Sequence, residues 1–202
     1  MKPSAGRSLV MALAEGAEAA YDFLLENEAV KAVPVLATAV RLLEGADDIR
    51  SRLLQEKIIV FVSEPALARS AESGEMLSRI RDDSSYAESI GDTLFLTLDK
   101  LTDLKKPALL AQVFAYQLAD NITKDELLML MHAIGTSALV DLELFISLRG
   151  VSGQNETGYK ARLASTGLLT GIVNAMVGAS TLGYFVSPLG LHFLNAVAPE
   201  PQ

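Results

Sequence analysis

"GLLTGIVNAMVGASTLGYFVSPLGLHFLNAV", residues 167–197, contains no lysine, arginine, aspartate or glutamate. The uncharged run extends from Leu163 to Pro199, whereas charged residues are spread through the rest of the chain. Such a run can be a membrane span, a buried core or a surface for a partner. The way in which it folds therefore decides which functions the protein can have.

Glycine and polar residues divide this run into short segments. Residues 168–177 and 182–187 have the composition of two strands with a tight turn between them. Gly167 is a typical residue after the end of a helix, and Ser187 and Pro188 are typical of a helix start. The run therefore predicts a short helix, a β-hairpin and a closing helix.

A helical membrane span is the alternative for the same residues. A span needs about 20 apolar residues, and Leu168 to Val186 is long enough. Asn174, Pro188 and the lack of solid Leu/Ile/Phe blocks argue against it. The alternative stays open on sequence alone.

Residues 1–149 read as a helical body. The β-branched run Ile58 to Val62 is interpreted as a buried helix end, because no second strand accompanies it. Ser85 with Glu88, and Thr123 with Glu126, fit capping boxes. The apolar spacing predicts helices at residues 8–28, 28–46 and 48–64, and further helices that start at Pro65, Ser85 and Pro107. The helix from Ser85 is expected to bury Ile90, Leu94, Leu98 and Leu101. The helix from Pro107 has Leu110, Phe114 and Leu118 in line.

The last predicted helix of the body is the longest and runs from Thr123 to about Leu148. Its expected buried stripe consists of Leu127, Met131, Ile134, Ala138, Leu142 and Phe145. The glycine-rich stretch "GVSGQNETG" follows it. We therefore expect a helical body over 1–149, a linker over 150–158 and a C-terminal module over 159–202. The fold class is mainly all-α, a multi-helix bundle with one β-hairpin.

The pattern "RLASTGLL … GYFVSPLGLHFLNAV" resembles the end of a winged-helix domain over about residues 157–197. In that family a helix leads into Gly-Leu-Leu, a hairpin forms the wing, and the returning strand starts the last helix. Residues 167–169 and 184–190 match those places. The body, from "VPVLATAVRLLEGADDIRSRLLQEKIIVFVSE" (33–64) through "ALVDLELFISL" (138–148), also resembles a group of short, uncharacterised bacterial proteins with a helical body and a winged-helix-like tail.

The charge pattern departs from that of winged-helix DNA readers. The formal net charge is −8, and residues 151–202 sum to zero, so residues 1–150 hold the whole excess. Only Lys160 and Arg162 lie near the expected wing. Because phosphate contacts supply most of the affinity for DNA, a winged-helix transcriptional regulator is the interpretation that the charge argues against.

If the wing projects, it exposes apolar side chains, and a patch of that kind typically marks a contact with a protein or a membrane. The opposite possibility is that the wing folds back and buries them on the helical body. The residues that we expect to bind a partner are Ile172, Val173, Met176, Val177, Leu182 and Tyr184.

No motif in the sequence carries recognisable chemistry. Cysteine is absent, and we expect His132 at a core edge and His192 without a nearby acid. Asp141 and Glu143 are expected to face solvent on either side of a buried leucine. We therefore predict no catalytic, cofactor-binding or metal-binding residue and no enzyme.

The prediction is a cytoplasmic, non-enzymatic binding protein, a sensor or adaptor whose partner is another protein or a second copy of itself. The similarity to bacterial proteins extends this to a role in phage defence. The alternative is a membrane-associated, lipid-engaging protein whose uncharged segment 163–199 inserts.

Overall fold

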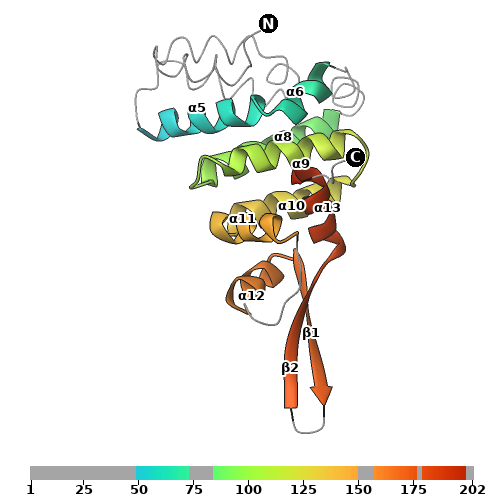
Figure 1. Ribbon diagram of the computed structural model, residues 1–202. Coiled ribbons are helices and arrows are strands. Elements are labelled where there is room, and N and C mark those ends of the chain that lie inside the picture. Colours follow the sequence, from blue (N-terminus) through green and yellow to red (C-terminus); the bar gives the residue numbers. More distant parts are fainter. Residues whose placement is uncertain (1–48, 73–83, 150–156, 177–178, 199–202) are drawn as a thin grey trace, which may run out of the picture. The chain divides into compact units, whose positions relative to one another are not determined.

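The computed structural model describes residues 49–72, 84–149, 157–176 and 179–198. Within these ranges the chain forms eight helices and one two-stranded antiparallel hairpin (Figure 1). The mainly α-helical fold class with one C-terminal hairpin is therefore confirmed. The helices expected at 8–28 and 28–46 lie outside the described residues, as does most of the expected linker. The chain divides into two compact units, residues 1–119 and 120–202, and each is described by itself.

Four helices of the first unit are described. α5 contacts α8 and α9, and α6 also contacts α9. The run from Ile58 to Val62 lies inside α5, so its interpretation as a helix end and not a strand is confirmed. The bounds are α5 (Ile49–Val62), α6 (Pro65–Glu72), α8 (Ser84–Lys100) and α9 (Lys106–Leu118).

The core of this unit is built from the apolar stripes of its helices. The rings of Phe61 in α5 and Phe114 in α9 meet with centroids 6.0 Å apart. The predicted stripe of Ile90, Leu94 and Leu98 on α8 is buried, and so is Leu101, which follows the end of the helix. The stripe on α9, with Leu110 and Leu118, is buried as well. Helical spacing in the sequence was sufficient to identify these faces.

The second unit begins with α10 (Lys124–Thr136), which starts in the predicted capping box. The Thr123 hydroxyl accepts from the backbone N–H of Glu126 at 3.3 Å, and the Glu126 carboxylate accepts from the backbone N–H of Thr123 at 2.8 Å. Both amides would otherwise lack partners at the helix start. The remaining elements of the unit are α11 (Leu139–Ser147), α12 (Thr157–Ser165), β1 (Leu169–Met176), β2 (Ala179–Val186) and α13 (Pro188–Val197).

The predicted single helix from Thr123 to Leu148 is wrong. Ser137 and Ala138 are extended, with ψ of 149° and 141°, and they separate α10 from α11. The chain bends by 116° between the two helices. Ala138, expected in the buried stripe, is exposed. The change of direction lets Phe145 of α11 stack on Phe193 of α13, with ring centroids 6.0 Å apart. The helical spacing of apolar residues in the sequence continues through Ser137 and Ala138. Tertiary packing therefore overrides this local pattern.

The division between the units differs from the expected boundary at residue 150. α10 contacts α13, and α11 contacts α12. The two helices assigned to the body by their sequence therefore pack with the C-terminal module, and the compact units divide before Asp120. The reason is the break at Ser137, because it turns α11 toward α12.

Candidate functional site

The base of the hairpin is held by the side chain of Ser187, between β2 and α13. Its hydroxyl accepts a hydrogen bond from the N–H of Gly190 at 2.9 Å, and it lies within donating distance of the carbonyl oxygens of Gly167 (2.5 Å) and Leu168 (3.1 Å). The predicted N-cap is therefore confirmed. The same group caps α13 and ties the entry of β1 to the exit of β2.

Two glycines allow this junction to close tightly. Gly167 has φ of +82°, a conformation that side chains with a Cβ rarely adopt. At Gly190, a Cβ would lie 2.1 Å from the carbonyl oxygen of Leu168. The first turn of α13 therefore approaches the start of β1 so closely that only glycine fits.

The two strands pair in a continuous register. It runs from Leu169 opposite Val186 to Met176 opposite Ala179, with one partner for each residue. Residues 179–181, which we assigned to the turn, belong to β2, and residues 177–178 lie outside the described part. The ladder continues through Ser180 and Thr181, although polar residues there favour a turn. Residues 169–176 and 179–186 thus form strands in place of the membrane helix that was the alternative.

Side-chain exposure rises along β1 away from the helices. Leu169 is 5% exposed, whereas Ile172 is 43% and Val173 is 66% exposed. In Figure 1 the hairpin continues beyond α12, the helix that contacts its base. The hairpin therefore leaves the helical part of its unit with Ile172 and Val173 uncovered.

Both faces of the hairpin carry exposed apolar side chains. Directly opposite residues share a face, and successive residues alternate between faces. Ile172 thus shares one face with Phe185, which is 47% exposed, and Val173 shares the other with the half-buried Tyr184. We call these four residues the hairpin surface.

The structure thus brings part of the predicted partner-binding set together. Ile172, Val173 and Tyr184 lie in one hairpin. Met176 and Leu182 lie in its strands, but their side chains are outside the described part, and so is Val177. Phe185 was missed, although alternation along β2 should have identified it as the residue facing away from Tyr184.

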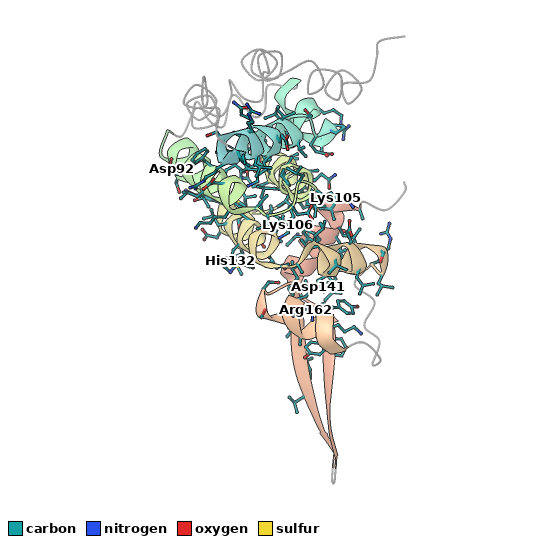
Figure 2. All side chains as sticks on the ribbon, turned by 90° about the vertical axis from the view of Figure 1, so that its left-hand side faces the viewer. Asp92, Lys105, Lys106, His132, Asp141 and Arg162 are labelled. Carbon is teal, nitrogen blue, oxygen red and sulfur yellow. The ribbon has the colours of Figure 1, made fainter. Side chains whose placement is uncertain are left out.

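The two cations near the hairpin are both engaged. Arg162 of α12 donates from Nε and a terminal nitrogen to the two carboxylate oxygens of Asp141 in α11, at 2.6 and 2.7 Å (Figure 2). Lys160 is buried. The expectation that Asp141 faces solvent is wrong, because the bend before α11 turns this carboxylate inward, where it is 2% exposed. Glu143 is exposed as expected.

The histidine predictions need two corrections. His132 is exposed on α10 and does not sit at a core edge. His192 does have a nearby acid, since its Nε2 lies 3.4 Å from Oε1 of Glu126 on α10. Sequence spacing could not reveal this pair, because it joins the two ends of the unit. Among the described residues, no group of three or more His, Asp or Glu side chains could hold a metal ion.

Two lysines of the first unit are perturbed by burial. Burial lowers the pKa of Lys57, although the charge of Asp99 opposes the shift, and burial likewise lowers the pKa of Lys106. The Lys57 ammonium donates to the backbone carbonyl of Asp99 at 2.9 Å, near the end of α8. A cation there satisfies a terminal carbonyl of the helix, so its role is explained by the fold.

In the described ranges, no single helix is long and apolar enough to cross a membrane. α10 and α11 reach that length and composition only when taken together, across their 116° bend. No family model, curated protein or solved structure matches the chain.

Proposed function

We propose that this protein acts by binding and not by catalysis, as a sensor or adaptor that engages a protein partner through the hairpin surface. The observation that carries the proposal is the exposure of apolar side chains on both faces of one hairpin. A two-stranded hairpin is marginally stable by itself in water, and contiguous exposed apolar surface typically marks an interaction site. Contact with another macromolecule would stabilise the hairpin and would cover its exposed apolar side chains.

A protein fits this hairpin better than the hydrocarbon of a membrane. In the described part of the chain the sheet has two strands, so each strand has one open edge of backbone N–H and C=O groups. Lipid hydrocarbon offers those groups no hydrogen-bond partner, and open sheet edges therefore do not enter it. A protein strand can pair with such an edge.

The resemblance to winged-helix ends is part of this proposal, with the wing used for protein contact and not for DNA. The engaged Arg162 and the buried Lys160 support that choice, because neither adds a free cation to the wing. A role in bacterial phage defence is the biological setting that we propose. It is tested by plating phages on bacteria with and without the protein, and on bacteria with Val173→Lys.

The chain offers a matched pair of positions for the direct test. Val173 on the hairpin is 66% exposed, and Val140 on α11 of the same unit is 65% exposed. A photo-crosslinking amino acid is placed at each position in turn in the full chain, and living cells are irradiated. We expect a protein adduct of discrete mass at position 173 and none at position 140.

Two outcomes would overturn the proposal. Equal adducts at both positions would mean that the hairpin is no preferred contact. Flotation of the purified protein with liposomes, abolished by Val173→Lys and not by Val140→Lys, would assign the hairpin to lipid instead.

A further inference from the structure

We infer that the partner of the hairpin is the hairpin of a second copy of this chain, joined along β1 to form an antiparallel four-stranded sheet. The inference rests on the proposed function, because it names the partner of the same surface. It is carried by three observations: the open edge of β1, the direction of its backbone groups, and the distribution of charge.

The edges of this hairpin lack the features that usually protect a strand. Natural edge strands carry charged residues, prolines or bulges that prevent pairing with another chain. Residues 169–186 contain no charged residue and no proline. The register between the strands of eight residues is continuous, without a bulge. Such an edge can accept a further strand along the part of the hairpin that continues beyond α12.

The direction of the backbone groups follows from one hydrogen bond at the base. The N–H of Ser187 donates to the carbonyl of Leu168 at 3.1 Å, so these opposite residues form a hydrogen-bonded pair. Such pairs alternate with pairs whose groups point outward. In the observed register the outward positions on β1 include Gly171 and Val173, and those on β2 include Leu182 and Tyr184.

β1 has the more accessible edge of the two. At the outward pair of Gly171 and Tyr184, Gly171 on β1 is exposed whereas Tyr184 on β2 is half-buried, and Val173, the next outward residue of β1, is exposed as well. Glycine within a strand also allows another backbone to approach closely. We therefore place the intermolecular contact on β1.

The charge distribution selects a second copy as the occupant. The net charge of −8 resides in residues 1–150, so two copies repel each other through their acidic parts. The hairpin lies inside the uncharged run 163–199, so pairing two hairpins along β1 sets no charged hairpin residue against another. A charged partner would lose hydration there without gaining a counter-charge. A two-fold axis brings identical uncharged surfaces together and closes the assembly at a dimer.

The test measures the mass of the full chain by sedimentation velocity, with proline at one outward position of each edge. Val173→Pro removes an outward N–H of β1 and leaves the bonds between β1 and β2 in place, and Leu182→Pro does the same on β2. We expect twice the chain mass of 21.6 kDa for the unmodified protein and for Leu182→Pro, and 21.6 kDa for Val173→Pro. Circular dichroism checks that both variants keep their helices.

Each other outcome overturns the inference, and the crosslinks at position 173 show whether the proposed function falls with it. A monomeric wild type, or a dimer that persists in Val173→Pro and dissociates in Leu182→Pro, removes the contact along β1. If the adduct at position 173 then contains a different protein, the proposed function stands without the inference. If wild type is monomeric and position 173 gives no protein adduct, both fall.

Discussion

At the residue scale, Asp141 and Arg162 form the clearest polar contact of the second unit. The carboxylate is almost inaccessible to water, with its side chain 3% exposed, and it accepts two parallel hydrogen bonds from one guanidinium. The hydrogen bond to Asp141 raises the pKa of Arg162. Paired geometry of this kind is the strong form of a charged hydrogen bond. It fixes α11 against α12, the helix that contacts the base of the hairpin.

A single and a double variant test whether the pair matters through its attraction or through its burial. Arg162→Met leaves a buried carboxylate without its guanidinium, so we expect a clear loss of thermal stability. Adding Asp141→Leu removes the isolated charge, and we expect most of the stability to return. The midpoint of thermal unfolding, followed by circular dichroism, measures both. A double variant less stable than Arg162→Met would contradict this account.

Glu126 provides a prediction for acid stability. The backbone N–H of Thr123 holds the pKa of Glu126 below its ordinary value of 4.5, and the Thr123 hydroxyl and His192 act in the same direction. A carboxyl with a lowered pKa in the folded state stabilises the fold above its unfolded pKa. That contribution is lost as the pH falls through the lower, folded pKa.

We therefore expect Glu126→Gln to be less stable than wild type at pH 7 and to lose less stability on acidification below about pH 4.5. Urea unfolding at a series of pH values from 7 to 3 measures the two slopes. Parallel slopes for wild type and variant would show that this carboxyl is not linked to folding.

At the element scale, the junction of the hairpin with α13 depends on one missing Cβ. In Gly190→Ala the new atom would lie 2.1 Å from a backbone oxygen of Leu168, which cannot move without shifting β1. We expect a loss of about 1–3 kcal/mol in the free energy of unfolding, the usual cost of overpacking. Urea denaturation measures it.

Gly158→Ala is the matched control for that substitution. Gly158 is exposed in α12, and the nearest atom to its added Cβ is the flexible end of Arg162, at 3.7 Å. Alanine is a better helix former than glycine by about 1 kcal/mol in a helix interior. We therefore expect unchanged or slightly higher stability. Equal losses in both variants would mean that the close approach at Gly190 is not the cause.

Much of the fold could be predicted because caps and apolar spacing are local signals. Thr123 and Ser187 each mark a helix start through their own side-chain hydrogen bonds. The bend at Ser137 has no such signal, because the residues around it keep a helical period. It depends on Phe145 meeting Phe193, a contact between residues far apart in the chain.

The candidate site was accessible to sequence reasoning for a similar reason. A projecting wing predicts that Ile172 and Val173 are exposed, and both are exposed in the structure. Asp141 could not be found, because its burial follows from the bend and its partner lies 21 residues away. The pair of His192 with Glu126 is likewise a product of tertiary packing.

At the scale of the whole molecule, charge and apolar surface are separated along the chain. Residues 1–150 carry the net charge of −8, and the hairpin carries none. Net charge keeps a protein soluble and opposes association. An exposed uncharged edge favours association. The two tendencies act on different parts of one chain, so their balance depends on ionic strength.

This balance gives the last prediction, in which salt strengthens self-association. At 0.01 M ionic strength the Debye length is about 30 Å, and at 0.15 M it is about 8 Å, so added salt screens the repulsion between acidic parts. Strand pairing between uncharged residues has no ion pairs for salt to weaken. We expect the dimer dissociation constant, measured by sedimentation equilibrium, to fall as sodium chloride is raised between those limits. Val140→Lys should show the same trend, because its charge lies outside the contact, and Val173→Lys should remain monomeric at both. A dissociation constant that rises with salt would instead mean that oppositely charged groups hold the copies together, and the contact would then have to lie outside the hairpin.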